Sequence, residues 1–211
     1  TEVQGLKFSD KTLENPIWIY WNKGIDSAPE IVKKCYESVC KHAKQEVVIL
    51  NDQNLADYIQ LPDYIEQKKA AGQIPMAGYA DLMRFALLAH YGGTWIDATV
   101  YLTDSIPTAI TESNFFAVRN SLLLIDNPVL YPAWFLHAKK GNKMIREIRN
   151  VAFAYWLKNE HVIEYLLPNL IITQVIKSEP EAEQTMPYMN SDYSEHLVKI
   201  LGDDFSEDKW K

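Results

Sequence analysis

The sequence predicts an α/β fold with a mixed, mostly parallel central sheet flanked by helices and followed by a helical C-terminal portion. Three observations support this. The N-terminal region alternates short apolar runs with helical patterns, an order typical of parallel strands joined by helices. A helical stretch at 77–90 leads through two glycines into a stretch of period two. Hydrophobic residues make up 47% of the 211-residue chain, which supplies a core for the single domain that we expect over residues 1–211.

The first elements follow that order. Pro16–Trp21 (PIWIYW) reads as a buried strand, and Asn22–Gly24 follows it as a loop. Ser27–Glu30 has the form of a capping box, so we expect a helix from there to about Ala43. A second strand is expected at Glu46–Leu50, and further helices at Gln53–Ile59 and near Pro62–Ala71.

The clearest local pattern runs from residue 75 to residue 107. Residues 77–90 carry apolar side chains at helical spacing, and Gly92 follows where a helix end favours a positive φ angle. From Thr94 to Leu102 the pattern has period two, so alternate side chains face opposite sides of a strand. One of these faces carries Trp95, Asp97, Thr99 and Tyr101. We therefore expect a helix, a glycine break and a strand that presents one carboxylate.

The sequence pattern changes after Pro107, where short predicted strands are followed by two helical patterns. Strong helical spacing returns at 142–157, and a further helical pattern at 161–177 contains Pro168, which we expect to interrupt it. Short strands are predicted at Asn114–Val118 and Leu122–Ile125, and Trp134–Ala138 fits either a strand or a helix. No repeat or long linker divides the chain.

The composition narrows the range of partners. The net charge of −7 argues against a nucleic acid, because a phosphate backbone needs clustered Lys and Arg. Arg84 is the only Lys or Arg between residues 70 and 118, so a nucleotide bound there would benefit from a metal ion. Cys35 and Cys40 lie on different faces of a predicted helix, so we expect no disulfide between them. Sparse cysteine and the lack of an 18-residue apolar run favour a cytoplasmic protein without a membrane span.

Aromatic and polar side chains stand at the ends of the predicted strands. Trp21 ends the first strand, Asn51 and Asp52 follow the second, and Asp97 lies on the third. Ligands bind beyond the carboxyl ends of parallel strands, so these residues point to one site. Trp21, with Tyr20 beside it, suits stacking on a nucleotide base, and core packing is the alternative. Asn51 and Asp52 suit hydrogen bonds to a base or ribose, and an Asx turn explains them equally well.

Three charged residues carry the candidate chemistry. A carboxylate on a buried strand, such as Asp97, is costly unless it is paired or bound to a cation. A metal ion held there would neutralise charge on a leaving diphosphate. The structural alternative is an Asp that caps a turn or pairs with a buried Arg. Asp81 and Arg84 lie one helical turn apart and suit one shared ligand, unless they form a surface ion pair that contributes little.

The run ADLMRFALLAHYGGTWIDATVYL resembles the core of the capsular-polysaccharide-synthesis glycosyltransferases and their relatives with a DXD sugar-binding region, a group similar to glycosyltransferase family 32. Their pattern is Asp-x-x-Arg on a helix, two glycines, an aromatic residue and Asp-x-Asp on a strand. The resemblance covers about residues 15–170 and is strongest at 76–107. The matching positions are Asp81, Arg84, Gly92, Gly93, Trp95 and Asp97, while Thr99 replaces the second Asp, a form frequent in the capsular subfamily.

The resemblance implies a fold of the GT-A type, with a nucleotide-sugar-binding half at about 15–107 and an acceptor-side, helical portion at about 108–211. It implies transfer of a sugar from a UDP-linked donor to a saccharide or lipid-linked saccharide acceptor in surface-polysaccharide synthesis, with retained anomeric configuration. The expected location is the cytoplasm, or the inner face of the membrane if the acceptor is lipid-linked.

Site residues also follow from the resemblance. Asp81 and Arg84 would contact the donor sugar or phosphate, with Trp95 beside them in the nucleotide-sugar site. Asp97 and Thr99 would hold Mn²⁺ or Mg²⁺. Independently of the resemblance, His196 near the C-terminus is a candidate late metal ligand.

Two other functions remain open on the sequence alone. The first is a hydrolase of nucleotide sugars, which would turn over without an acceptor. The second is a non-catalytic carbohydrate-binding protein with a degenerate motif, which the substitution at Thr99 suggests. Motifs of P-loop kinases, dehydrogenases, metalloproteases and serine hydrolases do not occur in the sequence.

Overall fold

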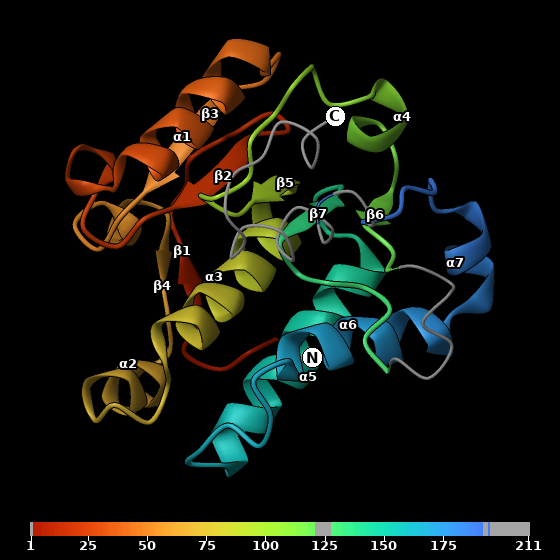
Figure 1. The fold of residues 1–211 in the computed structure, drawn as a ribbon. Coiled ribbons are helices and arrows are strands. Elements are labelled where there is room, and N and C mark those ends of the chain that lie inside the picture. The colour runs from red at the N-terminus through yellow and green to blue at the C-terminus, as the bar shows by residue number, and fades with distance from the viewer. Residues whose placement is uncertain (1, 121–127, 192–193, 195–211) are drawn as a thin grey trace, which may run out of the picture.

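The computed structural model describes residues 2–120, 128–191 and 194, and in this part of the chain a five-stranded sheet lies between two layers of helices (Figure 1). The second strand, β2, pairs in parallel with β3 and with β5, whereas β7 pairs antiparallel with both β5 and β6. The predicted mixed sheet is present, and its parallel pairs belong to the N-terminal half of the chain. It is not mostly parallel, because β7 runs antiparallel to both of its neighbours and so gives as many antiparallel pairs as parallel ones in the described residues. In sheet order the strands are β3 (Val47–Leu50), β2 (Ile17–Tyr20), β5 (Gly93–Ile96), β7 (Phe135–Ala138) and β6 (Phe115–Ala117).

Different helices cover the two faces of the sheet. Trp18 of β2 packs in the core cluster formed with α3 (Met76–Tyr91), α5 (Lys143–Lys158) and α6 (Leu167–Ser178). The neighbouring residues of β2 alternate with it, so they face the second core cluster beneath α1 (Glu30–His42) and α4 (Thr108–Thr111). Helix α3 is buried nearly all round, which suits its place between the sheet and α5.

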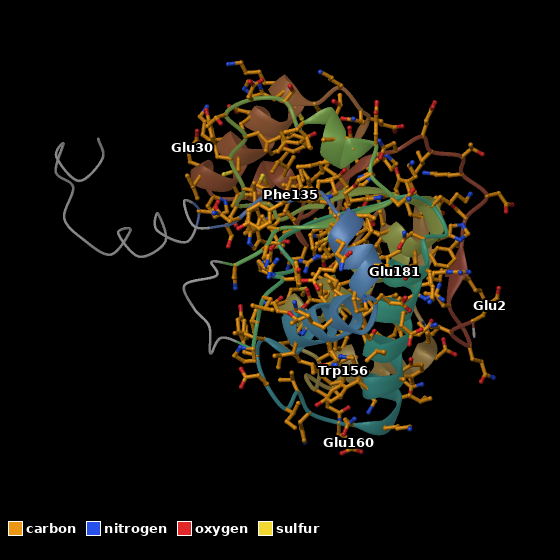
Figure 2. The ribbon with its side chains drawn as sticks, turned by 90° about the vertical axis from the view of Figure 1, so that its right-hand side faces the viewer. Glu2, Glu30, Phe135, Trp156, Glu160 and Glu181 are labelled. Carbon is orange, nitrogen blue, oxygen red and sulfur yellow. The ribbon has the colours of Figure 1, made fainter. Side chains whose placement is uncertain are left out.

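The remaining elements lie at the periphery. A two-stranded antiparallel sheet joins β1 (Lys7–Phe8) to β4 (Ile59–Gln60). Glu30 at the start of α1 and Glu160 just after α5 lie at opposite ends of the molecule, with Trp156 and Phe135 between them (Figure 2). None of the helices in the described residues is both long enough and apolar enough to span a membrane. The other short elements are α2 (Asp63–Ala70), α7 (Pro180–Thr185) and the 3-10 helices Ile25–Ser27 and Leu55–Asp57.

Several sequence predictions are confirmed. Strands β2 and β3 and helices α2, α3 and α5 begin and end within about two residues of the predicted limits. The ambiguous stretch at Trp134–Ala138 is a strand, and a strand also forms within Asn114–Val118. Cys35 and Cys40 are both free. The strand predicted at Leu122–Ile125 lies outside the described residues.

The strand predicted over Thr94–Leu102 is wrong beyond Ile96, where β5 ends. The amide of Asp97 donates to the carbonyl of Trp134 at 2.9 Å, and the amide of Val100 donates back to the carbonyl of Asp97 at 2.9 Å. This second bond closes a turn, so the chain leaves the sheet just where the Asp97 carboxylate is presented.

The helix predicted at 161–177 begins only at Leu167. Pro168 lies in its first turn, where a missing amide proton has no cost, so this proline starts the helix and does not interrupt it. The predicted capping box is also wrong. The Ser27 hydroxyl donates to the carbonyls of Lys23 and Gly24, and α1 begins after Pro29 without a side-chain cap.

The helix predicted at Gln53–Ile59 is wrong as well, because only a 3-10 turn forms there before β4. The Asn51 side-chain oxygen accepts from the amides of Gln53 and Asn54, and the Asn54 side-chain oxygen accepts from the amide of Asn51. Such local hydrogen bonds compete with helix formation. Ile59 then pairs with Phe8 in the small sheet.

Candidate active site

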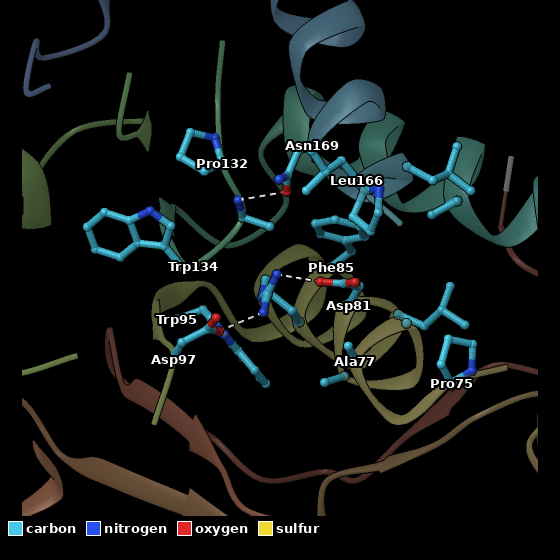
Figure 3. A pocket seen from close by; sticks show the side chains of 18 of the residues that line it. Pro75, Ala77, Asp81, Phe85, Trp95, Asp97, Pro132, Trp134, Leu166 and Asn169 are labelled. Atoms are coloured by element: carbon cyan, nitrogen blue, oxygen red, sulfur yellow. Dashed lines mark hydrogen bonds and ion pairs between the residues drawn. The ribbon is translucent and has the colours of Figure 1, made fainter. Parts of the chain in front are cut away.

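A cavity of about 430 Å³ opens at the carboxyl ends of β2 and β5 (Figure 3). One side is formed by the end of β2, by α3 and by the turn after β5. The opposite side is formed by residues 132–134, α5, α6 and the segment that connects these two helices. Among the residues proposed from the sequence, the cavity brings together Tyr20, Trp21, Asp81, Arg84, Trp95, Asp97 and Thr99. Asn51 and Asp52 do not line it.

Arg84 occupies the centre of this site, between two carboxylates. Its Nη1 lies 2.5 Å from Asp81 Oδ1, and its Nη2 lies 2.7 Å from Asp97 Oδ1. The indole nitrogen of Trp95 donates to the same Asp97 oxygen at 2.7 Å. The guanidinium carbon is also 4.9 Å from the centre of the Trp95 ring, which is cation–π distance. These contacts hold α3 and the turn after β5 in one arrangement (Figure 3).

The ion pair of Asp81 and Arg84 is not a surface pair. The Arg84 side chain is only 5% exposed and that of Asp81 15%, whereas the Asp97 side chain is 37% exposed. Burial raises the pKa of Asp81 to about 6; the Arg84 charge opposes this shift and the Asp97 charge adds to it. Arg84 Nε is also buried and has no hydrogen-bond partner among the described residues. Asp97 is therefore the member of the cluster that a ligand reaches most easily.

A second group of site residues lies at the carboxyl end of β2. Trp21 is half-buried and lines the cavity, as does Tyr20. The Tyr20 hydroxyl donates to Asp52 Oδ1 at 2.6 Å, and Lys69 Nζ lies 3.5 Å from the same oxygen. Burial, together with this carboxylate, raises the pKa of Tyr20, so its hydroxyl stays protonated. Asp52 thus orients Tyr20 from behind, and Asn51 is engaged in the turn described above.

The oxygen atoms of Asp97 and Thr99 fit a divalent cation that enters the site together with a phosphate-containing ligand. One oxygen of Asp97 accepts hydrogen bonds from Arg84 and Trp95, and within the described residues the other accepts none. Thr99 lines the cavity and is exposed. No group of three His, Cys, Asp or Glu suited to a metal ion occurs in the described part of the chain, and His196 lies outside it. Mg²⁺ commonly takes one or two carboxylates together with substrate phosphates, which agrees with this donor set.

Sequence reasoning missed the far side of the cavity. Trp134 precedes β7, Trp156 lies in α5, Tyr165 lies between α5 and α6, and Asn169 lies in α6. These residues show no motif, and they line the same cavity as Asp97 because β7 pairs with β5 and α5 packs on α3 and α6. The one sequence signal for this side of the cavity was Trp134, an aromatic residue immediately before β7.

The central mixed sheet flanked by helices, with the site at the strand ends, agrees with the GT-A-like fold expected from the sequence. The chain belongs to the capsular polysaccharide synthesis protein family, whose family model matches residues 2–211. Among solved structures, the chain is similar to the PaToxG glycosyltransferase, with a TM-score of 0.58 and 13% sequence identity. That similarity covers 96% of this chain and 84% of the other. No curated protein matches the sequence.

Proposed function

We propose that the protein is a glycosyltransferase that moves a sugar from a UDP-linked donor to a saccharide acceptor during capsular polysaccharide synthesis. The observation that carries this proposal is the buried Arg84, held between Asp81 and Asp97 inside a cavity at the strand ends. Family membership and the GT-A-like fold support it. If the acceptor is lipid-linked, the protein works at the cytoplasmic face of the membrane.

Each of the main cavity residues has a different role in this proposal. The nucleotide base stacks on Trp21, and the donor sugar and diphosphate extend along α3 toward Asp97. Asp81 and Asp97 accept hydrogen bonds from sugar hydroxyls. Arg84 stabilises the negative charge that develops on the leaving diphosphate, an effect that is strong in a site shielded from water. Mn²⁺ or Mg²⁺, held by Asp97 and Thr99, would neutralise part of the same charge.

We propose that the anomeric configuration is retained. The bond between the anomeric carbon and the diphosphate oxygen breaks, and the acceptor hydroxyl oxygen bonds to that carbon on the same face. The acceptor proton passes to the departing phosphate oxygen. This route needs no nucleophilic side chain from the protein.

A thermal-shift experiment with UDP, with and without Mn²⁺, tests the proposal. UDP at about 100 times its dissociation constant should add about 2.7 kcal/mol to the stability of the fold, with a larger effect in Mn²⁺. Trp21→Ala should weaken UDP binding roughly tenfold, because a stacked base contributes about 1–3 kcal/mol in comparable sites. The absence of any shift with UDP, GDP, CDP or dTDP would overturn the proposal.

Product analysis separates the two alternatives. Release of free sugar from the UDP-sugar at the same rate with and without an acceptor would identify a hydrolase. Glycan binding without any response to nucleotides would identify a carbohydrate-binding protein.

A further inference from the structure

The cavity continues past Arg84 onto a second wall of different character. This wall contains Trp134, Trp156, Tyr165, Leu166, Asn169 and Ile171. Among the described residues of the cavity lining, every charged side chain belongs to α3 or to the turn after β5, and this wall carries none. Its accessible aromatic groups are Trp134 and Tyr165. Trp134 lines the cavity but is half-buried, because it also packs against Phe135 and the second core cluster, whereas Tyr165 is 77% exposed.

The position of Trp134 relative to the charged cluster is set by the backbone. Its carbonyl accepts the amide of Asp97 at 2.9 Å, just before β7 pairs with β5. In Figure 3 the Trp134 side chain lies beside Asp97 and Trp95, on the edge of the same cavity. A molecule packed on Trp134 therefore lies next to the carboxylate at which we place the donor.

The wall combines apolar surface with a few hydrogen-bonding groups. A pyranose ring has a face of C–H bonds that packs on aromatic rings, and its hydroxyls bond at the edge. Asn169 Oδ1 accepts the amide of Ala133 at 3.1 Å, which fixes the side chain and leaves its amide N–H groups for a ligand. The hydroxyl of Tyr165 is a second hydrogen-bonding group on this wall.

The charges of the cavity select the kind of sugar. Two carboxylates, Asp81 and Asp97, face one guanidinium, Arg84, so the side chains of the cluster carry an excess of negative charge. In the donor complex the diphosphate adds negative charge, and one divalent cation only offsets that addition. Among the described residues of the second wall, a carboxylate or phosphate group on an incoming acceptor finds no Lys or Arg to offset the repulsion.

From these observations, and resting on the transferase function proposed above, we infer that the second wall is the acceptor subsite and that it binds an uncharged sugar unit stacked on Trp134. Uronate and phosphorylated units are excluded from it. Trp134 is thus a specificity-determining residue of the acceptor side.

Binding of methyl glycosides tests this inference. The full chain, saturated with UDP, is titrated by saturation-transfer NMR with the methyl glycosides of glucose, galactose and N-acetylglucosamine. The methyl glycosides of glucuronic and galacturonic acid serve as charged counterparts of similar shape. At least one neutral glycoside should bind at least tenfold more tightly than its charged counterpart. Equal affinity within each pair, or no binding of any neutral glycoside, would overturn the inference.

Variants assign the binding to the wall. Trp134→Ala should weaken binding of the neutral glycoside about tenfold, and Trp134→Phe, which keeps a ring, should weaken it less. Tyr165→Ala should also weaken binding; its side chain is largely exposed, so this variant folds even if Trp134→Ala does not. Tyr188→Ala, at a tyrosine that is 61% exposed and outside this cavity, is the matched control and should change nothing. Unchanged affinity in Tyr165→Ala and in the folded Trp134 variants would refute the assignment.

The two proposals fail in different ways. A UDP-induced thermal shift without neutral-glycoside binding removes the acceptor subsite and leaves the transferase function. Glycoside binding that depends on Trp134, without any nucleotide response, removes the transferase function and leaves the sugar site.

Discussion

At the scale of single residues, the site depends on the buried guanidinium of Arg84, which forms an ion pair with a carboxylate on each side. Removing Arg84 from water is costly, and the pairs with Asp81 and Asp97, together with the Trp95 ring, offset that cost. Deleting Arg84 would leave the buried Asp81 carboxylate without its partner, so an alanine there tests stability as much as function. Asp97 is the better residue for a functional test, because it is the most exposed member of the cluster.

We predict that Asp97→Asn lowers turnover by about 100-fold or more while the protein remains folded. The amide oxygen of Asn still accepts the hydrogen bonds from Arg84 and Trp95, but it lacks the charge that would hold a cation and orient the donor. Steady-state kinetics and thermal unfolding measure the two effects separately. Asp104→Asn is the control, since among the described residues that exposed carboxylate accepts only from the amide of Ser105. Wild-type turnover in Asp97→Asn would assign Asp97 a structural role.

At the scale of elements, the junction between α3 and β5 decides the geometry. Gly92 has a φ angle of 76° and Gly93 one of 100°. A Cβ atom on Gly93 would lie 2.2 Å from the carbonyl oxygen of Pro16. This close approach allows the amide of Thr94 to donate to Pro16 at 2.8 Å, beside β2. The predicted positive φ of Gly92 is confirmed, and the contact at Gly93 keeps Arg84 and Asp97 on the same side of the sheet.

We predict that Gly93→Ala destabilises the protein by about 3 kcal/mol, because it adds a backbone clash to an unfavourable φ angle. Urea unfolding measures the change in the free energy of unfolding. Gly72→Ala is the matched control, since Gly72 has a φ angle of 72° but no atom within 4 Å of the added Cβ. It should lose only about 1 kcal/mol, the cost of the left-handed conformation. Equal losses in the two variants would contradict the importance of the close approach.

At the scale of the whole molecule, the sheet buries a titratable group between its strands. His137 of β7 is fully buried, and its Nδ1 lies 2.9 Å from Thr94 Oγ1 of β5. Burial lowers the pKa of His137 to about 4. The unfolded chain therefore binds a proton first as the pH falls, and stability declines between about pH 6.5 and pH 4. Asp81 acts in the opposite direction, because its raised pKa gives stability that is lost as the pH rises through about 6.

We predict that His137→Gln removes the acid-side loss of stability caused by this histidine. Between pH 7 and pH 4, wild type should lose on the order of 3 kcal/mol relative to the variant, because the pKa of His137 is about 4 in the folded protein and about 6.5 in the unfolded chain. Urea unfolding at several pH values gives this difference. His161→Gln, at an exposed histidine, should follow wild type. Parallel pH profiles for wild type and His137→Gln would show that the buried imidazole is not responsible.

Local sequence patterns were sufficient for a large part of this structure. The run from α3 through Gly92 and Gly93 to β5 is contiguous, so its helical spacing, its glycine break and its change of period were enough to predict a helix, a turn and a strand in that order. The same holds for β2, β3 and α5, whose apolar patterns match their burial. The order of strands and helices was enough to predict the class of fold and the edge of the sheet where the site lies.

Other features depended on tertiary contacts. The hold of Trp134 on Asp97, the ion pair of Arg84 with Asp97 and the wall around Trp134 all arise from contacts between residues that local patterns do not connect. Local propensity carries no record of such pairing. Asp97 is still held to β7 because the carbonyl of Trp134 is there to accept its amide. The sequence alone determined which charged residues lie near the site. Only the fold decided that Arg84 and Trp95 donate to the same oxygen of Asp97, because burial and distances between side chains are set once the sheet and the helices have packed.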